Sequence, residues 1–267
     1  MRKNISASLL ISALLASVAF ISASGRNSSD NYRLVWEENF DSTDIDSDSW
    51  RMMYRRNSDA GRYFSRYPHM YEMVDGCIRL FAKNNYGTES NDTARFLTAG
   101  IETFGKKSFR YGKIEVRARM KGATGVWPAI WLRGVDERYS TYPDYAEIDI
   151  MERLNHDSYV YQTVHTDYTD NQKLFRKIKS SGTAPFNEND FNVFSVEILP
   201  NKIILSVNGR KTLEYRKLAN RQGQFPFGCE MHLMLDIQLG GRWVGQINPS
   251  ELPAYLDIDW VRFYEKQ

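Results

Sequence analysis

Glu147-Ile148-Asp149-Ile150-Met151-Glu152 places three carboxylates in an apolar frame near the middle of the chain. Successive side chains of a β-strand point to opposite faces, so Glu147 and Asp149 share one face while Ile148 and Ile150 share the other. Regular alternation would turn Glu152 toward the isoleucines, where an unpaired carboxylate is costly or becomes protonated. We therefore expect a β-bulge at Ile150-Met151, which returns Glu152 to the face of the other two carboxylates.

Carboxyl groups gathered on one face suit the hydrolysis of a glycosidic bond. Retaining hydrolysis uses two of them, roughly 5–5.5 Å apart: one attacks the anomeric carbon and the other protonates the leaving oxygen. Glu147 and Glu152 would take these parts. Asp149, between them, would share a proton or a hydrogen bond with the nucleophile, and like-charge neighbours separate the titrations of such groups. The alternative is a solvent-facing acidic edge strand. Ile148 and Ile150 argue against it, because isoleucine is usually buried.

A longer set of motifs resembles glycoside hydrolase family 16. The resemblance runs from residues 34–41 through 111–115, 127–131 and 147–152 to 257–264. The inserted Met151 is similar to the laminarinase-like branch of this family, whose motif carries the bulge. The resemblance implies that Glu147 is the nucleophile, Glu152 the acid/base and Asp149 the assisting carboxylate.

Aromatic residues near the carboxylates are candidates for sugar contacts, because pyranose rings stack their apolar C–H faces on indole and phenol rings. Trp127 and Trp131 share one face of a predicted strand and would form either a platform in the cleft or ordinary core. The family resemblance favours the cleft.

In 231–239 the alternation leaves Asp236 and Gln238 on a polar face that could line the cleft or meet solvent. The following segment, 240–245, resembles the glycine-tryptophan loop of laminarinases. We therefore expect Asp236, Gln238 and Trp243 to contact the substrate.

His165 is expected on the strand after the catalytic one, where it would hydrogen-bond the sugar or the assisting carboxylate; a purely structural histidine is the alternative. No grouping of His, Asp and Glu has metal-ligand spacing, so no cofactor is expected for catalysis. The resemblance implies one further feature, a structural calcium held by Asp259 with backbone carbonyls near Glu38 and Gly76.

The chain reads as many short strands separated by turns, without long helical periodicity. Asn208-Gly209, between two alternating segments, predicts a two-residue β-hairpin turn. Strands are expected at 112–120, 159–166, 191–199, 202–207, 231–239 and 256–264. We therefore predict an all-β fold, a two-sheet antiparallel β-sandwich. The resemblance implies a β-jelly roll whose concave sheet forms the substrate cleft.

Residues 1–24 have the pattern of a signal peptide: Arg2 and Lys3, an apolar run over 5–21, and small residues at its end. A membrane anchor is the alternative, although the run is near the short limit for spanning. Residues 25–267 are expected to form a single catalytic domain, secreted or periplasmic after cleavage, without a membrane span and monomeric.

Charge argues against nucleic acid as a partner. Two of the 35 basic residues lie in the leader, which leaves 33 against 33 acidic ones. A strongly basic footprint, as nucleic acid or a densely sulfated polysaccharide would require, is absent at the level of the whole protein. A local set of arginines could still face an anionic group or remain a solvated surface: Arg51, Arg55, Arg56, Arg62 and Arg66. Cys77 and Cys229 could form a disulfide in an oxidising compartment or stay as buried thiols.

The function expected is that of a retaining endo-glycosidase acting on a polysaccharide, with β-1,3(4)-glucan as the first substrate. Segments 153–165 and 61–66 look like gut-bacterial members that act on mixed-linkage glucan or on mucin-type galactosyl chains. The early loop also departs from the Asn-Asn-Glu-rich loop of typical laminarinases. An endo-β-1,4-galactosidase acting on mucin O-glycans or keratan-type chains is therefore the alternative. An alternative of another class, a non-catalytic glycan-binding module, has no reason to keep three like charges together.

Overall fold

The structure is a computed structural model that describes residues 32–87, 91–174 and 177–267. The expected signal peptide, 1–24, lies outside the described residues. Within them, no helix is both long enough and apolar enough to cross a membrane.

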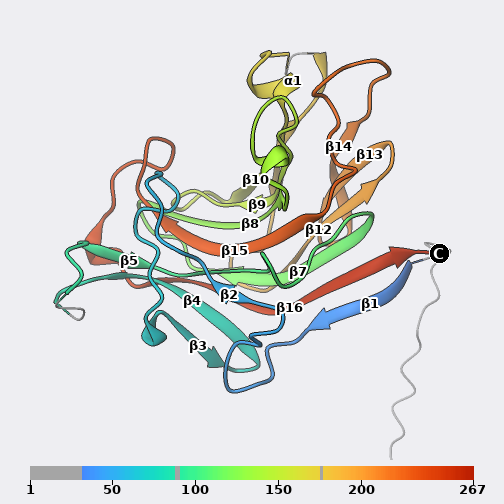
Figure 1. Cartoon of the computed structure of the whole chain (residues 1–267). Helices are drawn as coiled ribbons and strands as arrows, with labels where there is room; N and C mark the ends of the chain where they lie inside the picture. The colour runs from blue at the N-terminus through green and yellow to red at the C-terminus, as the bar shows by residue number, and fades with distance from the viewer. Residues whose placement is uncertain (1–31, 88–90, 175–176) are drawn as a thin grey trace, which may run out of the picture. The chain divides into compact units, whose positions relative to one another are not determined.

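Two antiparallel sheets pack face to face, as predicted for a β-sandwich (Figure 1). The first has nine strands in the order β14-β13-β12-β7-β16-β4-β3, with β1 added on β16 and β5 on β4. Its strands are β1 (Tyr32–Glu38), β3 (Tyr71–Val74), β4 (Cys77–Asn84), β5 (Phe96–Thr98), β7 (Gly112–Met120), β12 (Asn192–Leu199), β13 (Lys202–Val207), β14 (Arg210–Arg216) and β16 (Ala254–Lys266).

The second sheet has seven strands in the order β11-β10-β9-β8-β15-β6-β2. They are β2 (Arg51–Met52), β6 (Gly100–Glu102), β8 (Val126–Gly134), β9 (Glu147–Glu152), β10 (Tyr159–His165), β11 (Ser181–Pro185) and β15 (Met231–Leu239). In Figure 1 these strands bow, and loops rise on both sides of the outer face. The strand that carries the three carboxylates, β9, lies inside this sheet between β8 and β10.

Helical structure in the described residues is confined to short segments. The α-helix α1 (Asp167–Asp170) begins after Thr166, whose side chain accepts a hydrogen bond from the backbone N–H of Thr169. Short 3₁₀ turns cover Pro68–Met70, Glu137–Ser140 and Pro249–Glu251.

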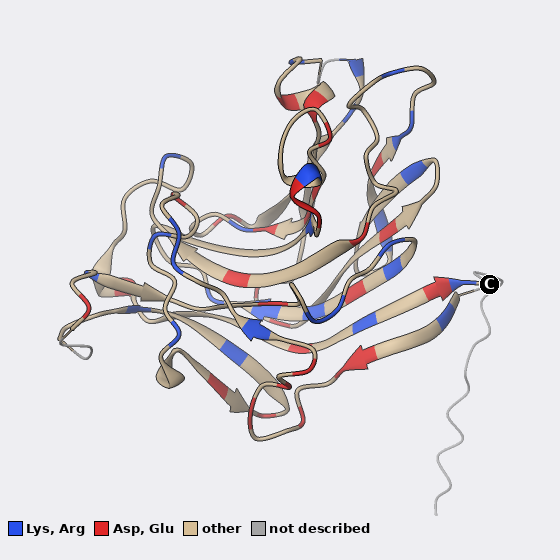
Figure 2. Cartoon of the chain, viewed as in Figure 1, with Lys and Arg blue, Asp and Glu red and all other residues tan. Residues whose placement is uncertain are grey.

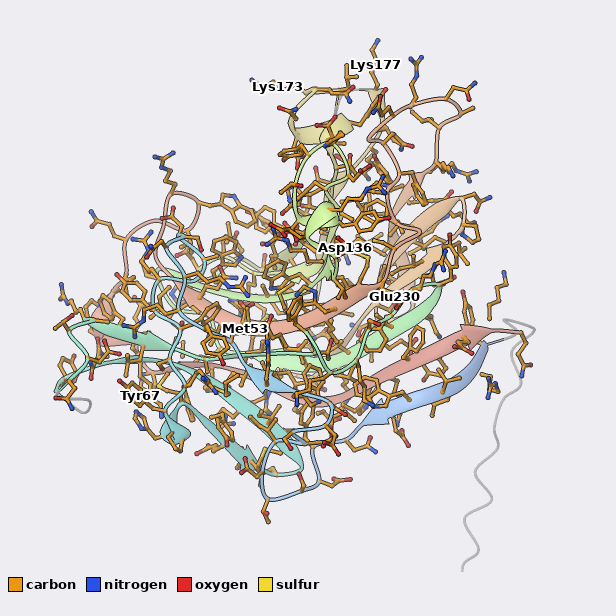
Figure 3. The ribbon with its side chains drawn as sticks, in the orientation of Figure 1. Met53, Tyr67, Asp136, Lys173, Lys177 and Glu230 are labelled. Atoms are coloured by element: carbon orange, nitrogen blue, oxygen red, sulfur yellow. The ribbon has the colours of Figure 1, made fainter. Side chains whose placement is uncertain are left out.

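The core fills the space between the two sheets. In β7 buried and half-buried residues alternate along the whole strand, as the period-2 pattern predicts for a sheet with one face on the core. Ile148 and Ile150 of β9 are fully buried on the inner face of the other sheet. Side chains crowd the interior in Figure 3, where the buried Met53 joins a smaller cluster with Phe64 on the outer side of the seven-stranded sheet.

Several predicted bounds hold to the residue, including those of β7, β13 and β15. The predicted hairpin is also present. Asn208 and Gly209 have φ angles of 50° and 74°, the left-handed values that a type I′ turn requires at both central residues.

Both cysteines are buried free thiols in the structure. Cys77 begins β4 of the nine-stranded sheet, whereas Cys229 precedes β15 of the other. Basic and acidic residues are interspersed over the described strands and loops (Figure 2).

Candidate active site

The predicted bulge in β9 is confirmed by its pairing with β8. Glu152 lies opposite Ala129 and Met151 opposite Ile130, but the next pair is Asp149 with Trp131, so Ile150 has no partner. The same irregularity occurs in the pairing with β10. The extra residue keeps Ile150 in the core while Glu147, Asp149 and Glu152 face the same side of the sheet.

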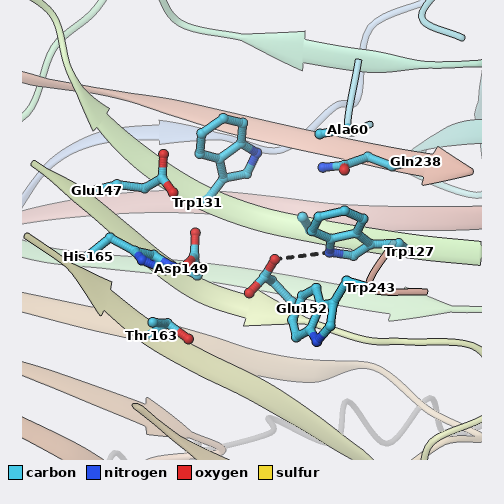
Figure 4. A pocket seen from close by; sticks show the side chains of 11 residues that line it. Ala60, Trp127, Trp131, Glu147, Asp149, Glu152, Thr163, His165, Gln238 and Trp243 are labelled. Carbon is cyan, nitrogen blue, oxygen red and sulfur yellow. Dashed lines mark hydrogen bonds and ion pairs between the residues drawn. The ribbon is translucent and has the colours of Figure 1, made fainter. Parts of the chain in front are cut away.

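A pocket of about 410 Å³ lies over these carboxylates on the outer face of the seven-stranded sheet (Figure 4). Besides the carboxylates, the pocket is lined by five residues that the sequence analysis expected at the site and by smaller residues that it did not. The lining includes Trp127, Trp131, His165, Gln238 and Trp243, all predicted, together with Ala60 and Thr163. Strands far apart in sequence therefore bring the predicted residues together.

Each glutamate has a neutral hydrogen-bond donor. The indole Nε1 of Trp127 donates to Glu152 Oε1 at 3.0 Å (Figure 4). The hydroxyl of Tyr145 donates to Glu147 Oε2 at 2.5 Å. These bonds fix the directions of the two carboxyl groups without adding a charge.

Asp149 has a charged partner instead. Nε2 of His165 lies 3.1 Å from Asp149 Oδ2, and Nδ1 of the same ring lies 2.9 Å from Asp170 Oδ2. Burial disfavours the charged imidazole, but hydrogen bonds to the two aspartates outweigh it and raise the pKa of His165 to about 11. The ring is therefore an imidazolium at neutral pH. Of the two contacts predicted for it, the structure shows the one with Asp149.

The pKa values of both glutamates are raised. Burial, and then the nearby Asp149, raise the pKa of Glu147 to about 7. The same two causes raise the pKa of Glu152 well above its usual value. Burial next to Asp149 thus favours the protonated form of both glutamates, the form in which a carboxyl group can act as an acid.

One wall of the pocket is aromatic. Trp243, 47 % exposed, packs edge-on against Trp127 with ring centroids 5.1 Å apart and lies at the same distance from Tyr161. Tyr159 continues the row at 5.3 Å from Tyr161. Such a row offers ring faces and edges to successive sugars of a chain.

Asp236 corrects one expectation. It is fully buried and does not line the pocket, so a direct sugar contact is wrong for this residue. Its carboxylate accepts hydrogen bonds from Trp131 Nε1 at 2.7 Å and from Gln238 Nε2 at 2.8 Å. Asp236 therefore positions two lining residues from below.

The ligand atoms of Glu147, Asp149 and His165 lie within 4.8 Å of one another, a group that could hold a metal among the described residues. Both ring nitrogens of His165 already face carboxylates, and an imidazolium has no lone pair to offer. The group therefore fits an ion pair better than a metal site.

The expected calcium ligand is also occupied. The carboxylate of Asp259 forms an ion pair with Arg117, beside an irregularity in the pairing of β16 with β7. A guanidinium on this carboxylate does not fit a calcium ligand, and the calcium site remains a prediction.

Known proteins match almost the whole of this chain. Residues 28–262 match the family model described as Glycosyl hydrolases family 16. The chain belongs to glycosyl hydrolase family 16.

Two relatives within the family illustrate its range. A keratan-sulfate endo-1,4-beta-galactosidase from Sphingobacterium multivorum is 30% identical over 238 residues, covering 88% of this chain and 56% of that protein. A beta-glucanase from Rhodothermus marinus is 30% identical over 256 residues, covering 88% and 85%. The chain thus spans little more than half the length of the first of these relatives.

Solved structures in family 16 share the fold. The laminarinase from Rhodothermus marinus superposes with a TM-score of 0.78 at 26% identity, covering 88% of this chain and 98% of that one. The laminarinase catalytic domain from Thermotoga maritima gives a TM-score of 0.76, also at 26% identity. The predicted jelly-roll type of sandwich is therefore confirmed.

Sequence reasoning missed two residues that hold this family 16 site together. Tyr145 precedes β9, and its hydroxyl reaches Glu147. Asp170, at the end of α1, reaches back to His165. The only signal for the second was the Thr166 cap, which starts a helical turn directly after His165.

Proposed function

We propose that the protein is a retaining endo-glycosidase in which Glu147 is the nucleophile, Glu152 the general acid/base and Asp149 the assisting carboxylate. The observation that carries this proposal is the bulge at Ile150, which sets three carboxyl groups on one face of β9 beneath an aromatic-walled pocket. Membership of family 16 supports the reaction class.

The raised pKa of Glu152 supports the division of roles. Glu147 has to be ionised to attack the anomeric carbon, and Glu152 has to be protonated to deliver a proton to the leaving oxygen. Burial and the nearby Asp149 raise the pKa of Glu152 well above its usual value, which favours the protonated form that the general acid needs. After attack, a covalent glycosyl-enzyme remains on Glu147, and Glu152, now ionised, takes a proton from the water that releases the sugar.

Asp149 and His165 act beside the nucleophile. The imidazolium of His165 compensates the charge of Asp149, so that three carboxyl groups can lie together without all remaining protonated. It also lowers the pKa of Glu147 against the effect of burial. His165 therefore favours the ionised nucleophile, against the opposing effect of Asp149.

The substrate we propose is a β-1,3(4)-glucan, with the beta-glucanase and laminarinase relatives in support. The row Trp127-Trp243-Tyr161-Tyr159 suits a chain that extends beyond the reacting sugar, which favours internal cleavage. A keratan-type galactosyl chain is the second candidate, because a keratan-sulfate endo-galactosidase is as similar in sequence as the glucanase.

The test is chromatography of the products formed from laminarin, mixed-linkage glucan and keratan-type glycans. Oligosaccharides released by the wild-type protein would establish an endo-glycosidase, and the glycan that yields them identifies the substrate. Glu147→Gln keeps the shape of the side chain but removes its charge, and should lower turnover on the order of a thousandfold or more. Turnover that survives this substitution would disprove the assignment of the nucleophile.

A protein that binds these glycans but cleaves none would instead be a glycan-binding module. Action outside the cytoplasm, as a monomer, agrees with the leader pattern at 1–24 and with a polymeric substrate, and these two points remain predictions.

A further inference from the structure

A second pocket, of about 240 Å³, opens on the outer face of the seven-stranded sheet beyond Trp131. Three arginines surround a buried acid and a buried ring; the residues that define this arginine pocket are Arg51, Arg56, Arg133, Glu102, Phe104 and His232. None of them takes part in the reaction described above.

The arginine pocket is continuous with the active site. A depression of about 300 Å³ between them is lined by Trp131 and Gln238, which belong to the active-site pocket, and by Arg56 and Arg133, which belong to the arginine pocket. Arg133 follows Trp131 by two residues on β8, on the same face and about 7 Å further along the strand. It lies opposite Glu147 on β9 and opposite His232 on β15. A glycan seated over Trp131 therefore reaches this pocket.

The charge of the arginine pocket is positive. Glu102 is 1 % exposed and accepts two hydrogen bonds from Arg51, at 3.1 and 2.9 Å, and a longer one of 3.5 Å from Arg56. One buried carboxylate thus pairs with two guanidinium groups, and Arg133 adds a third positive charge to the lining. His232 adds no charge, because burial and then the three arginines lower its pKa to about 4.

Donors in the pocket are also left over. Arg133 has no carboxylate partner among the described ion pairs. Its guanidinium makes one described hydrogen bond, from Nη2 to the Ser140 carbonyl at 3.1 Å. The buried Nε–H of Arg133 has no partner with hydrogen-bond geometry in the described part of the chain; nor has Nδ1 of His232, which donates or accepts according to the tautomer of the neutral ring. Buried donors are rarely left in this state unless another group binds them.

We propose that the arginine pocket binds an acidic substituent of the glycan, a sulfate ester or a carboxylate, on a sugar next to the one over Trp131. The proposal rests on the proposed function, since it assigns a further recognition site to the same cleft. Guanidinium groups bind such oxyanions with paired, charge-assisted hydrogen bonds. The excess positive charge is local, because the basic and acidic residues after position 24 balance in number. A local excess fits a single acidic substituent rather than a densely charged polymer.

The test compares neutral, sulfated and 6-carboxylated laminarin, and native with desulfated keratan sulfate, by calorimetric titration of the Glu147→Gln protein. We expect the acidic form to bind about tenfold more tightly than the neutral form of the same polysaccharide, the effect of one hydrogen-bonded charge. The form that shows this preference, sulfate or carboxylate, identifies the substituent. Equal affinity for acidic and neutral forms of every polysaccharide would overturn the proposal.

Variants of the pocket give the second measurement. In the same background, Arg133→Gln and Arg56→Gln should each bring the ratio of acidic to neutral affinity close to one, whereas Arg56→Lys keeps the charge and should retain part of it. Arg33→Gln, which removes an exposed arginine of the other sheet, is the matched control and should keep the whole preference. Arg51 is left in place because it holds Glu102. A preference that persists in both glutamine variants would overturn the proposal, because neither Arg56 nor Arg133 would then bind the acidic substituent.

The two proposals fail differently. If the wild-type protein cleaves no polysaccharide, the proposed function is wrong whatever the binding ratios are. If it cleaves a neutral glycan and the Glu147→Gln protein shows no preference for the acidic forms, only the proposal for the arginine pocket is wrong.

Discussion

His165 joins two aspartates, with Nε2 3.1 Å from Asp149 Oδ2 and Nδ1 2.9 Å from Asp170 Oδ2. Asp149 lies among the carboxylates of β9, whereas Asp170 belongs to α1 on the loop that follows β10. A residue outside the pocket lining thus maintains the positive charge beside the proposed nucleophile.

Asp170→Asn should move the acidic limb of the pH profile of kcat/KM to higher pH. The loss of one carboxylate lowers the pKa of His165, and a less charged ring no longer lowers the pKa of Glu147, which is about 7 in the native protein. Because Glu147 has to be ionised to react, activity then appears only at a higher pH. A shift of up to about one pH unit is expected.

Asp170 also accepts a hydrogen bond from the Tyr142 hydroxyl, so Tyr142→Phe is the matched control. It removes that contact but leaves both bonds of His165 in place, and its acidic limb should coincide with that of the wild type. If the two variants shift equally, the effect comes from the loop and not from the charge on His165.

Glu152→Ala should affect substrates according to their leaving groups. A natural glycan needs a proton on its departing oxygen, and the loss of the general acid should reduce its turnover by about 10²–10⁴-fold. An aryl glycoside with a good leaving group needs little protonation in the first step and should lose much less. Equal losses on both substrates, measured as kcat/KM, would contradict the acid role.

The sequence predicted the carboxylate face because parity alone forces a choice at Glu152. Either a charged group enters the core beside Ile148 and Ile150, or the strand gains a residue, and the structure has the bulge. Parity also predicted that Trp127 and Trp131 share one face, whereas the family resemblance was needed to assign them and Gln238 to the cleft. The regular pairing of β8 with β15 brings the three residues to one surface.

The burial of individual side chains and the contacts made by loops could not be predicted in this way. Alternation assigns Asp236 to the outer face but does not show that Trp131, Gln238 and the cluster of Met53 and Phe64 cover it. The contacts that Tyr145 and Asp170 make with Glu147 and His165 depend on how loops return to the sheet, and strand periodicity carries no information about that.

Trp127→Phe should move the basic limb of the pH profile to higher pH. The indole N–H donates to Glu152 at 3.0 Å and so stabilises its ionised form. Phenylalanine keeps an aromatic ring but donates nothing, which raises the pKa of Glu152 further above its usual value. The acid then holds its proton to a higher pH, and kcat/KM falls later on the alkaline side.

Trp243→Phe is the comparison for this experiment. Trp243 lines the same pocket and packs against Trp127, but no hydrogen bond joins it to Glu152 in the described structure. Both variants should weaken glycan binding, but only Trp127→Phe should displace the basic limb. An unchanged limb in both would mean that the indole N–H does not control Glu152.

Asp236→Asn should destabilise the protein most at low pH and raise KM. Its buried carboxyl accepts hydrogen bonds from Trp131 and Gln238, and an asparagine would turn an N–H toward one of these donors, a loss of about 1–3 kcal/mol in the free energy of unfolding. Trp131 would also lose the bond that orients its ring in the pocket, so the glycan should bind more weakly.

The pH dependence follows from the raised pKa of Asp236. Burial is the main cause that brings this pKa to about 7 in the folded protein, against an ordinary value of about 4 when unfolded. Between these values the folded state holds the extra proton, so this contribution to stability is present below pH 4 and is lost as the pH rises through 7. Asparagine does not titrate, and the difference in stability between wild type and variant should therefore shrink from pH 5 to pH 8. Urea unfolding at the two pH values measures it, with the exposed Asp48→Asn as control; a gap that stays constant would show that Asp236 keeps an ordinary pKa.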